Sequence, residues 1–258
     1  MTATSGSKST NTAKTKSTVS ETGHAKNVAN LQDVIAFVTG YGPSYNPSKK
    51  ALKLPQLTAL AMASQASLAD VITKNTAYNN TVNDRAAAFR TLKPLATKVV
   101  NALQITDAIT QKVDDAKGFN KKLQGPKEKK NKKPTDPNTV VPKTISTSQQ
   151  SYDQQIQHFA ALLSVVQSET SYAPNETELK MASLTAKQTD LIVKNNAVAT
   201  AYAAVSNSRI ARDTLLYKEE TGLLYIVDDI KKYIKSIYGA ASPEFAQVKG
   251  LKFRKKLA

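Results

Sequence analysis

Hydrophobic residues recur at helical spacing through most of this chain. Two shorter segments, residues 27–41 and 150–169, place apolar residues at i, i+3, i+4 and i+7, the pattern of a helix with one buried face. Two longer segments carry an apolar seam spaced alternately three and four, from Leu54 to Leu103 and from Met181 to Ile230. Such a seam predicts packing against partner helices, as in a bundle or coiled coil. The less apolar positions of this seam include Ser64, Arg85, Asn195, Tyr202, Arg209, Arg212 and Glu219.

Each long segment, 49–104 and 176–232, is either a single helix or a helical hairpin. No Gly or Pro lies between Pro55 and Pro94, or between Pro174 and Gly222, and the seam keeps its phase, which favours one helix. The clusters "YNNT" (78–81) and "VSNS" (205–208) and the short average helix of globular proteins favour a hairpin. We expect a continuous helix, with breaks at Pro94 and at residues 221–222.

Two similar strings suggest that the chain contains a duplication. "SYNPSKKALK" (44–53) recurs as "SYAPNETELK" (171–180) at a separation of 127 residues, and further matches follow without a gap. Upstream the offset slips by one residue, so that Leu31 matches Phe159. The ordered matches predict two homologous helical repeats, residues 25–120 and 146–258.

The repeated string is typical of a turn that leads into a helix. In the second copy Asn175 can cap the helix while Glu178 reaches back, which is a capping box. We expect the prolines to stiffen the turn and the tyrosines to pack beneath it. The residues of this interpretation are Tyr45, Pro47, Tyr172, Pro174, Asn175 and Glu178. In the segment "SPEF" (242–245), Ser242 is expected to cap a closing helix.

These patterns predict an all-α protein, an elongated helical bundle with long coiled-coil-like helices built from two homologous repeats that pack together. Residues 1–24 are rich in Ser, Thr and Lys and are expected to form a disordered tail. Residues 121–145 are rich in Lys and Pro and are expected to form a basic, flexible linker.

The net charge of +16 comes mainly from the tail, the linker and the C-terminus, since the two helical bodies sum to about +1. These cations are candidates for polyanion binding, with a solubilising linker as the alternative. No aromatic residue lies among the linker lysines, so stacking on single strands is not supported. The candidate cations are Lys121, Lys122, Lys127, Lys129, Lys130, Lys132, Lys133, Lys252, Arg254, Lys255 and Lys256.

The arginines Arg85 and Arg212 fall at matching positions on the apolar seam. Each must pair with another group or extend to the surface, and binding of a small anionic ligand is the alternative. The neighbouring Asp84 and Asp213 lie at an unfavourable spacing for pairing. Whether the two arginines share a site is open at this point.

Catalytic and cofactor chemistry is poorly supported. The chain has no Cys, and it contains neither a phosphate-binding Gly loop nor Gly-x-Ser-x-Gly. We place His24 in the tail and His158 at the start of an apolar helical face, so that neither is expected to bind a metal. The sequence therefore predicts no enzyme, no cofactor and no metal site.

Several stretches resemble an uncharacterised family of two-repeat helical proteins from Bacteroidota. They are "AYNNTVNDR" and "LATKVVNAL" in the first repeat, with "YAPNETELK", "SRIARD", "LYKEETGL", "KKYIKSIYGA" and "KFRKK" in the second. The resemblance implies the helical fold and no known activity.

The function that we expect is that of a non-enzymatic scaffold or interaction protein with protein partners or self-association. The alternatives are non-specific nucleic-acid or polyanion binding through the linker and termini, and small-anion binding at the seam arginines. The polar N-terminus and the lack of any apolar run of about 18 residues predict a cytoplasmic protein without a transmembrane segment.

Overall fold

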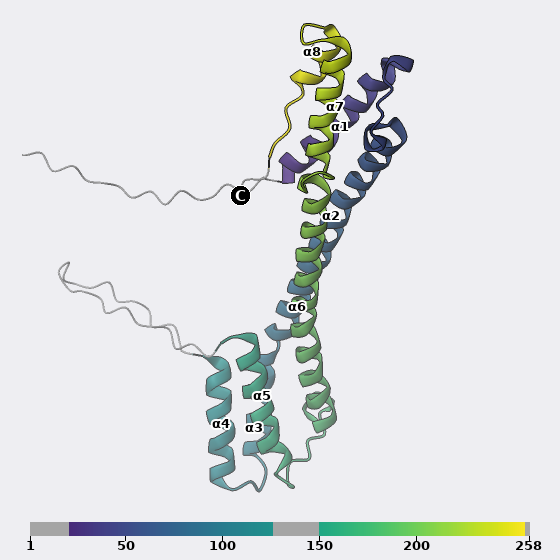
Figure 1. Ribbon diagram of the computed structural model, residues 1–258. Helices are drawn as coiled ribbons and strands as arrows, with labels where there is room; N and C mark the ends of the chain where they lie inside the picture. Colours follow the sequence, from purple (N-terminus) through teal and green to yellow (C-terminus); the bar gives the residue numbers. More distant parts are fainter. Residues whose placement is uncertain (1–20, 126–149, 256–258) are drawn as a thin grey trace, which may run out of the picture. The chain divides into compact units, whose positions relative to one another are not determined.

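The computed structural model describes residues 21–125 and 150–255, and all regular structure within these ranges is helical (Figure 1). The prediction of an all-α fold is confirmed. The α-helices are α1 (Glu21–Gly40), α2 (Leu54–Arg90), α3 (Leu92–Gln104), α4 (Thr110–Gln124), α5 (Tyr152–Gln167), α6 (Met181–Tyr217), α7 (Leu223–Tyr238) and α8 (Pro243–Gly250). Short 3-10 turns are η1 (Gly42–Ser44), η2 (Lys50–Leu52) and η3 (Thr177–Leu179).

The helices α2 and α6 are each continuous over 37 residues. The segments "YNNT" and "VSNS" lie inside them, so a hairpin at these points is excluded. The breaks come where they are expected, after Arg90, ahead of Pro94, and between Tyr217 and Leu223. At the second break Gly222 is required, because a Cβ there would lie 2.6 Å from the backbone nitrogen and oxygen of Lys218.

The described residues divide into two compact units, and each unit draws on both predicted repeats. Unit 1 contains α1, the part of α2 up to Lys74, the part of α6 from Val205, α7 and α8. Unit 2 contains the part of α2 from Asn75, α3, α4, α5 and the part of α6 up to Ala204. The units therefore do not coincide with the sequence bodies 25–120 and 146–258.

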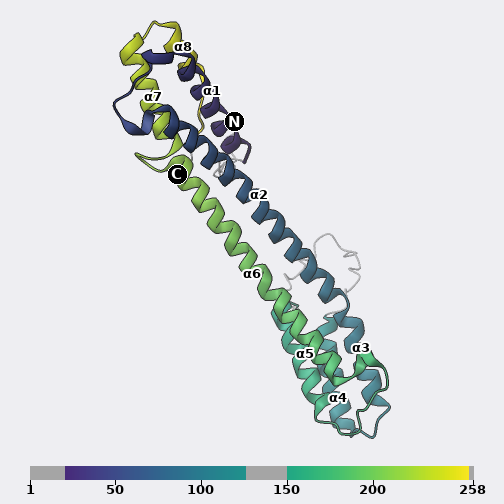
Figure 2. The same cartoon turned by 90° about the vertical axis from the view of Figure 1, so that its right-hand side faces the viewer.

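The core of unit 1 is formed mainly between α1 and α7, which lie side by side with α8 in Figures 1 and 2. Leu31 and Val34 of α1 and Ile230 of α7 belong to this core and have no exposed surface. The ends of α2 and α6 complete this core. Its fully enclosed members are Leu31, Val34, Val38, Leu57, Leu216, Leu223, Ile230, Ile234 and Val248.

The core of unit 2 is formed by α3, α4 and α5 with the first turns of α6 (Figure 2). Phe159 of α5 is fully buried in this core, which also contains leucines from α3, α4 and α6. The other fully enclosed members are Leu92, Ala96, Val99, Leu103, Ala116, Leu123, Leu162, Leu184 and Leu191. Three residues of the predicted seam are instead exposed, namely Tyr202, Arg209 and Glu219.

The two turns that lead into the long helices are built alike. The hydroxyl of Tyr45 donates to the carbonyl oxygen of Leu52 at 2.7 Å, and that of Tyr172 to the carbonyl oxygen of Leu179 at 3.0 Å. Both rings are buried as expected, and burial raises the pKa of both phenols, that of Tyr172 to about 12. Each tyrosine thus fixes the end of the 3-10 turn that precedes its helix.

The predicted capping box is wrong. The turn η3 lies between Asn175 and the start of α6 at Met181, so that Asn175 is too far upstream to cap this helix. No side chain caps η3, and the carboxylate of Glu178 instead bonds the Nζ of Lys98 at 2.6 Å. The cap at Ser242 is confirmed, since its hydroxyl accepts the backbone N–H of Phe245 at 3.1 Å.

Substitution of Tyr45 or Tyr172 by Phe tests whether the two turns are equivalent. Each change removes one hydrogen bond and leaves a carbonyl oxygen without that donor, which should cost about 1 kcal/mol of unfolding free energy. Urea unfolding followed by circular dichroism would measure it. Substitution of the exposed Tyr202 by Phe is the control and should change the free energy little. A clear loss for only one of the two turns would contradict their equivalence.

Three boundaries differ from those expected. Helix α1 begins at Glu21, so His24 lies in a helix and not in a tail, while residues 1–20 lie outside the described residues. Helix α4 continues to Gln124, so Lys121 and Lys122 belong to a helix and not to the linker. The residue that follows this helix is Gly125, whose φ of 77° is a backbone conformation that glycine adopts readily. The remaining linker lysines lie outside the described residues, as does Lys256.

Candidate functional site

Residues 251–255, which we call the strap, form an extended segment after α8 that is held by two buried asparagines of α1. The side-chain amide of Asn27 donates to the backbone oxygen of Arg254 at 2.9 Å, and its Oδ1 accepts the Arg254 N–H at 2.8 Å. One turn along α1, Asn30 donates to the backbone oxygen of Lys252 at 2.8 Å. The two asparagines thus bind alternate residues of the strap through its backbone.

The phenol of Tyr217 joins this polar cluster at the end of α6. Its oxygen lies 2.6 Å from Nδ1 of His24, and Asn27 Nδ2 donates to it at 3.3 Å. His24, Asn27 and Asn30 are all buried on the face of α1 that also carries Leu31. Sequence reasoning missed this cluster. The available signal was the pair of asparagines, three residues apart, within the apolar face of a helix.

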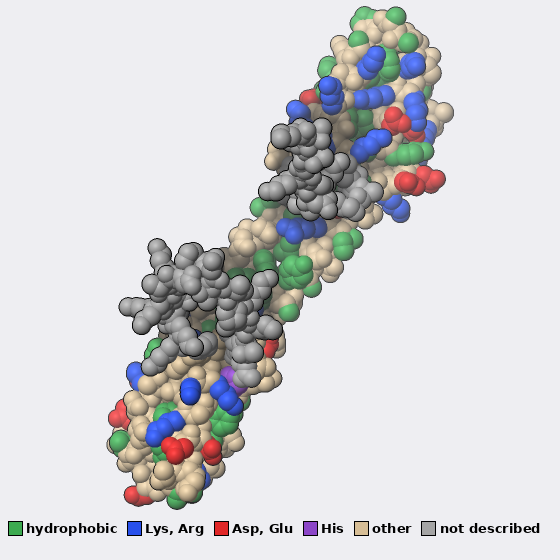
Figure 3. Space-filling model, turned by 90° about the vertical axis from the view of Figure 1, so that its left-hand side faces the viewer, with side chains coloured by type: hydrophobic (Ala, Val, Ile, Leu, Met, Phe, Trp, Pro, Cys, Tyr) green, Lys and Arg blue, Asp and Glu red, His purple; other side chains and the backbone are tan. Residues whose placement is uncertain are grey.

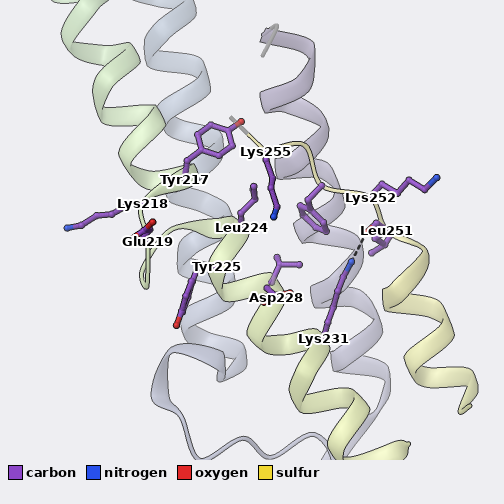
Figure 4. A pocket seen from close by; sticks show the side chains of 12 residues that line it. Tyr217, Lys218, Glu219, Leu224, Tyr225, Asp228, Lys231, Leu251, Lys252 and Lys255 are labelled. Carbon is purple, nitrogen blue, oxygen red and sulfur yellow. Dashed lines mark hydrogen bonds between the residues drawn. The ribbon is translucent and has the colours of Figure 1, made fainter. Parts of the chain in front are cut away.

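Beneath the strap lies an open cavity of about 1180 Å³, which we call the strap cavity (Figure 4). The end of α6, the loop that follows it, α7 and the strap form its walls. The lining residues are Tyr217, Lys218, Glu219, Leu224, Tyr225, Val227, Asp228, Lys231, Leu251, Lys252, Phe253 and Lys255. All of them belong to unit 1.

Two lysines approach the interior of the strap cavity, while two others point away from it. Figure 4 shows Lys255 extending over Leu224 and Lys231 extending from α7 toward the strap, whereas Lys218 and Lys252 point outward. The Nζ of Lys231 donates to the backbone oxygen of Leu251 at 2.7 Å and lies 5.3 Å from the centre of the Phe253 ring. Burial lowers the pKa of Lys231.

Two carboxylates near the strap cavity form ion pairs with cations other than Lys231 and Lys255. Asp228 forms an ion pair of 2.7 Å with Lys232, one turn along α7. Asp229 forms an ion pair of 2.6 Å with Lys49, and the Nζ–carboxylate hydrogen bond lowers the pKa of this aspartate. Glu219 lines the edge and is exposed. The cavity therefore carries an excess of positive charge.

Arg85 lies in unit 2 and is held by two neighbouring helices. Its guanidinium group lies 4.1 Å from the centre of the Tyr152 ring, and its Nη1 donates to Asn195 Oδ1 at 3.2 Å. Asn195 in turn donates to Asp153 at 2.8 Å. These contacts match the structural interpretation, in which the seam arginine pairs with a facing helix.

Arg212 lies in unit 1 and bonds its own neighbour on α6. Its Nε and Nη2 both donate to Oδ1 of Asp213, at 3.0 and 2.7 Å, while the arginine is buried. The expectation that adjacent residues are poorly spaced for pairing is wrong here, because the long arginine side chain folds back along the helix. Since Arg85 and Arg212 belong to different units and have different partners, we assign no common site to them.

The remaining predicted site residues are divided between the units. Lys121 and Lys122 are exposed on α4 of unit 2, and Lys252, Arg254 and Lys255 are exposed on the strap of unit 1. His158 is buried in α5, where burial and the nearby charge of Lys122 lower its pKa. Among residues 21–125 and 150–255 no group of three or more His, Asp or Glu side chains is placed to hold a metal ion.

Comparisons of the chain with protein-family models, with curated proteins and with solved structures found no match. The resemblance to a Bacteroidota family therefore stays a prediction. None of the helices in the described part of the chain is both long and apolar enough to span a bilayer.

Proposed function

We propose that this protein is a non-enzymatic helical interaction protein and that unit 1 binds a negatively charged macromolecular partner. The observation that carries the proposal is the cationic surface fixed by the strap. Between Leu223 and Lys255 the chain carries seven Lys and Arg residues against three carboxylates, and two of these carboxylates are already in ion pairs. Lys and Arg side chains gather on the part of unit 1 that is seen in the upper half of Figure 3.

The outward cations of α8 and the strap are held in place by the fold. The backbone bonds of Asn27 and Asn30 fix the positions from which Lys252 and Arg254 extend into solvent. The Nζ of Lys249 on α8 lies 6.0 Å from the centre of the Phe245 ring. Because the backbone that carries these cations is already ordered, it loses little conformational entropy when they bind a partner. This favours the strap surface as the binding surface.

We propose in addition that the two repeats arose by duplication. Helices α2 and α6 have the same length of 37 residues, and both their first and their last residues are separated by 127 positions. The same tyrosine-to-carbonyl hydrogen bond precedes both helices. We also propose that the long helices pair in a coiled-coil-like manner. The resemblance to the Bacteroidota family and the cytoplasmic location stay proposals as well.

Replacement of Lys249, Lys252 and Arg254 by Gln tests the binding surface. We expect the intact protein to bind a short DNA duplex, poly-glutamate or both, with an affinity that falls steeply as salt is raised. For DNA, the substitution should reduce the slope of log affinity against log salt by about 0.9 for each phosphate that the variant no longer neutralises. Fluorescence anisotropy at several salt concentrations measures both effects.

The matched control replaces Lys117, Lys121 and Lys122 by Gln, which removes the same charge from α4 of unit 2. This control should bind nearly as the intact protein does. Binding of DNA alone would identify nucleic acid as the partner class, binding of poly-glutamate alone would identify acidic proteins, and binding of both would indicate recognition of negative charge without preference for either class. Equal reductions of affinity in the two variants, or no binding of either probe at low salt, would overturn the proposal.

A further inference from the structure

We propose that the strap cavity binds an amphipathic anion, with its charged head group at Lys231 and Lys255 and its apolar part against Leu224 and Phe253. The ligand class is a single-chain carboxylate or alkyl phosphate. This small-molecule site is separate from the outward basic face of α8 and the strap. It uses the inward side of the strap, whereas the macromolecular partner uses the outward side.

The alternation of side chains along the extended strap creates the two sides. In an extended segment successive side chains point in opposite directions. Leu251, Phe253 and Lys255 line the strap cavity. Lys252 borders the cavity as well, but its side chain points away from it in Figure 4, and Arg254 is not among the lining residues. An apolar, an aromatic and a cationic side chain therefore face the same space.

The cavity wall is built by dedicated polar contacts. The strap is fixed by Asn27 and Asn30, which have exposed fractions of 0% and 3%, and by the bond from Lys231 to the backbone of Leu251. Three side chains from two helices thus hold an extended segment over a space of about 1180 Å³. Ligand sites of soluble proteins combine apolar walls with a few placed polar groups in the same way.

The charge of the interior selects an anion. Lys231 and Lys255 reach the cavity, and the lining contains four lysines against the two carboxylates Glu219 and Asp228. Asp228 is in an ion pair with Lys232, although its charge also acts on Lys231 and partly offsets the effect of burial on the Lys231 pKa. The half-buried Nζ of Lys231 makes one hydrogen bond among the described residues and stands over the Phe253 ring. Burial disfavours its charged form, as the direction of its pKa shows, and a bound anion would relieve this cost.

Unit 2 is built differently at the corresponding place. The string "KGFNKKL" (117–123) at the end of α4 is similar to "KGLKFRKKL" (249–257), which includes the end of α8 and the strap. In the predicted alignment Gln155 and His158 occupy the positions of Asn27 and Asn30. There the chain continues as helix α4 up to Gln124, and Leu123 fills the core. In unit 1 the closing helix α8 ends at Gly250 and the strap replaces any further helical turns. The strap and its cavity are therefore a feature that this alignment assigns to unit 1.

The test compares four small molecules that share a ten-carbon chain. Isothermal titration calorimetry of the full chain should show saturable binding, with one molecule per chain, of decanoate, decyl phosphate or both. Decan-1-ol should bind at least about tenfold more weakly, and decyltrimethylammonium should not bind, because the interior is cationic. Decanoate and decyl phosphate distinguish a carboxylate from a phosphate head group.

Lys255→Gln should weaken binding of the preferred anion by about tenfold, since it removes one charge-assisted contact. Lys255 is exposed and lies outside the buried core of unit 1, so the variant should fold. Lys218→Gln is the matched control, because Lys218 borders the same cavity but points away from it. NMR shifts of Leu224 and Phe253 on addition of decanoate or decyl phosphate should place the ligand beneath the strap.

Any of three results would overturn the proposal. The first is equal binding of decanol and the anions, and the second is an equal effect of Lys218→Gln and Lys255→Gln. The third is the lack of saturable binding of either anion at concentrations up to about 1 mM. A dissociation constant above this value corresponds to a binding free energy weaker than about 4 kcal/mol, which we regard as too weak for a specific site. None of these results bears on the outward cations, so the macromolecular proposal is judged separately.

Discussion

Two fragments of this chain, residues 1–125 and 150–258, should each fail to fold cooperatively alone and should regain helical structure when mixed. The reason is the composition of the units. The core of unit 1 needs α1 from the first fragment and α7 from the second, and that of unit 2 needs α3 from the first and α5 from the second. Helices without a partner for their apolar face are marginal in water.

Far-UV circular dichroism of the separate and mixed fragments measures this effect, and size-exclusion chromatography reports the complex. The control is the intact chain cleaved at a protease site placed between residues 126 and 149, which should stay associated after the cut. If residues 150–258 alone show the helical signal and a cooperative thermal transition, the predicted repeat is an independent domain and the prediction fails.

Leu31→Ala should destabilise α1 together with α7 and α8. Leu31 has no exposed surface, and removal of a buried leucine side chain costs about 2–5 kcal/mol. Hydrogen exchange followed by mass spectrometry should then show faster exchange in α1, α7 and α8, which share its core. Helices α4 and α5 should keep their protection, because they belong to the other unit.

The matched variant is Phe159→Ala, at the position that the sequence alignment pairs with Leu31. Phe159 is equally buried, and its removal should cost about 3–5 kcal/mol and speed exchange in α3, α4 and α5. Were the sequence bodies the folding units, Leu31→Ala would instead expose α3 and α4 and spare α7 and α8. That pattern would contradict the division into units.

Local features of the chain were predictable because they depend on neighbours in sequence. The three-and-four spacing of the seam indicated the long helices, and the breakers Pro94 and Gly222 indicated their ends. The cap at Ser242 followed from a short motif whose hydrogen bond closes within a few residues. The prediction of a capping box at Asn175 and Glu178 was wrong although it is also a local feature, because the turn η3 between Asn175 and α6 could not be recognised from residue types alone.

The candidate site was less predictable. Lys252, Arg254 and Lys255 were recognised as candidate cations from the basic composition of the C-terminal segment. The ordered backbone that positions them depends on Asn27 and Asn30, which lie more than 200 residues away in sequence. The partner of Arg212 was also missed. The rule that ion pairs on a helix form between residues three or four apart assumes fixed side-chain directions, whereas a long arginine side chain can bend back to the next residue. Contacts between distant segments leave no periodic signal in the sequence.

The long helices, their breaks and their apolar faces could be predicted from the sequence, because these properties follow from local spacing and turn chemistry, whereas the start of α1 and the end of α4 could not. The apolar faces that meet could be identified only from the packed fold. An apolar stripe on α1 is satisfied by any complementary stripe, and the hydrophobic effect that buries it is not directional. The pairing of α1 with α7 and of α3 with α5, and with it the strap cavity, arises from packing across the whole chain.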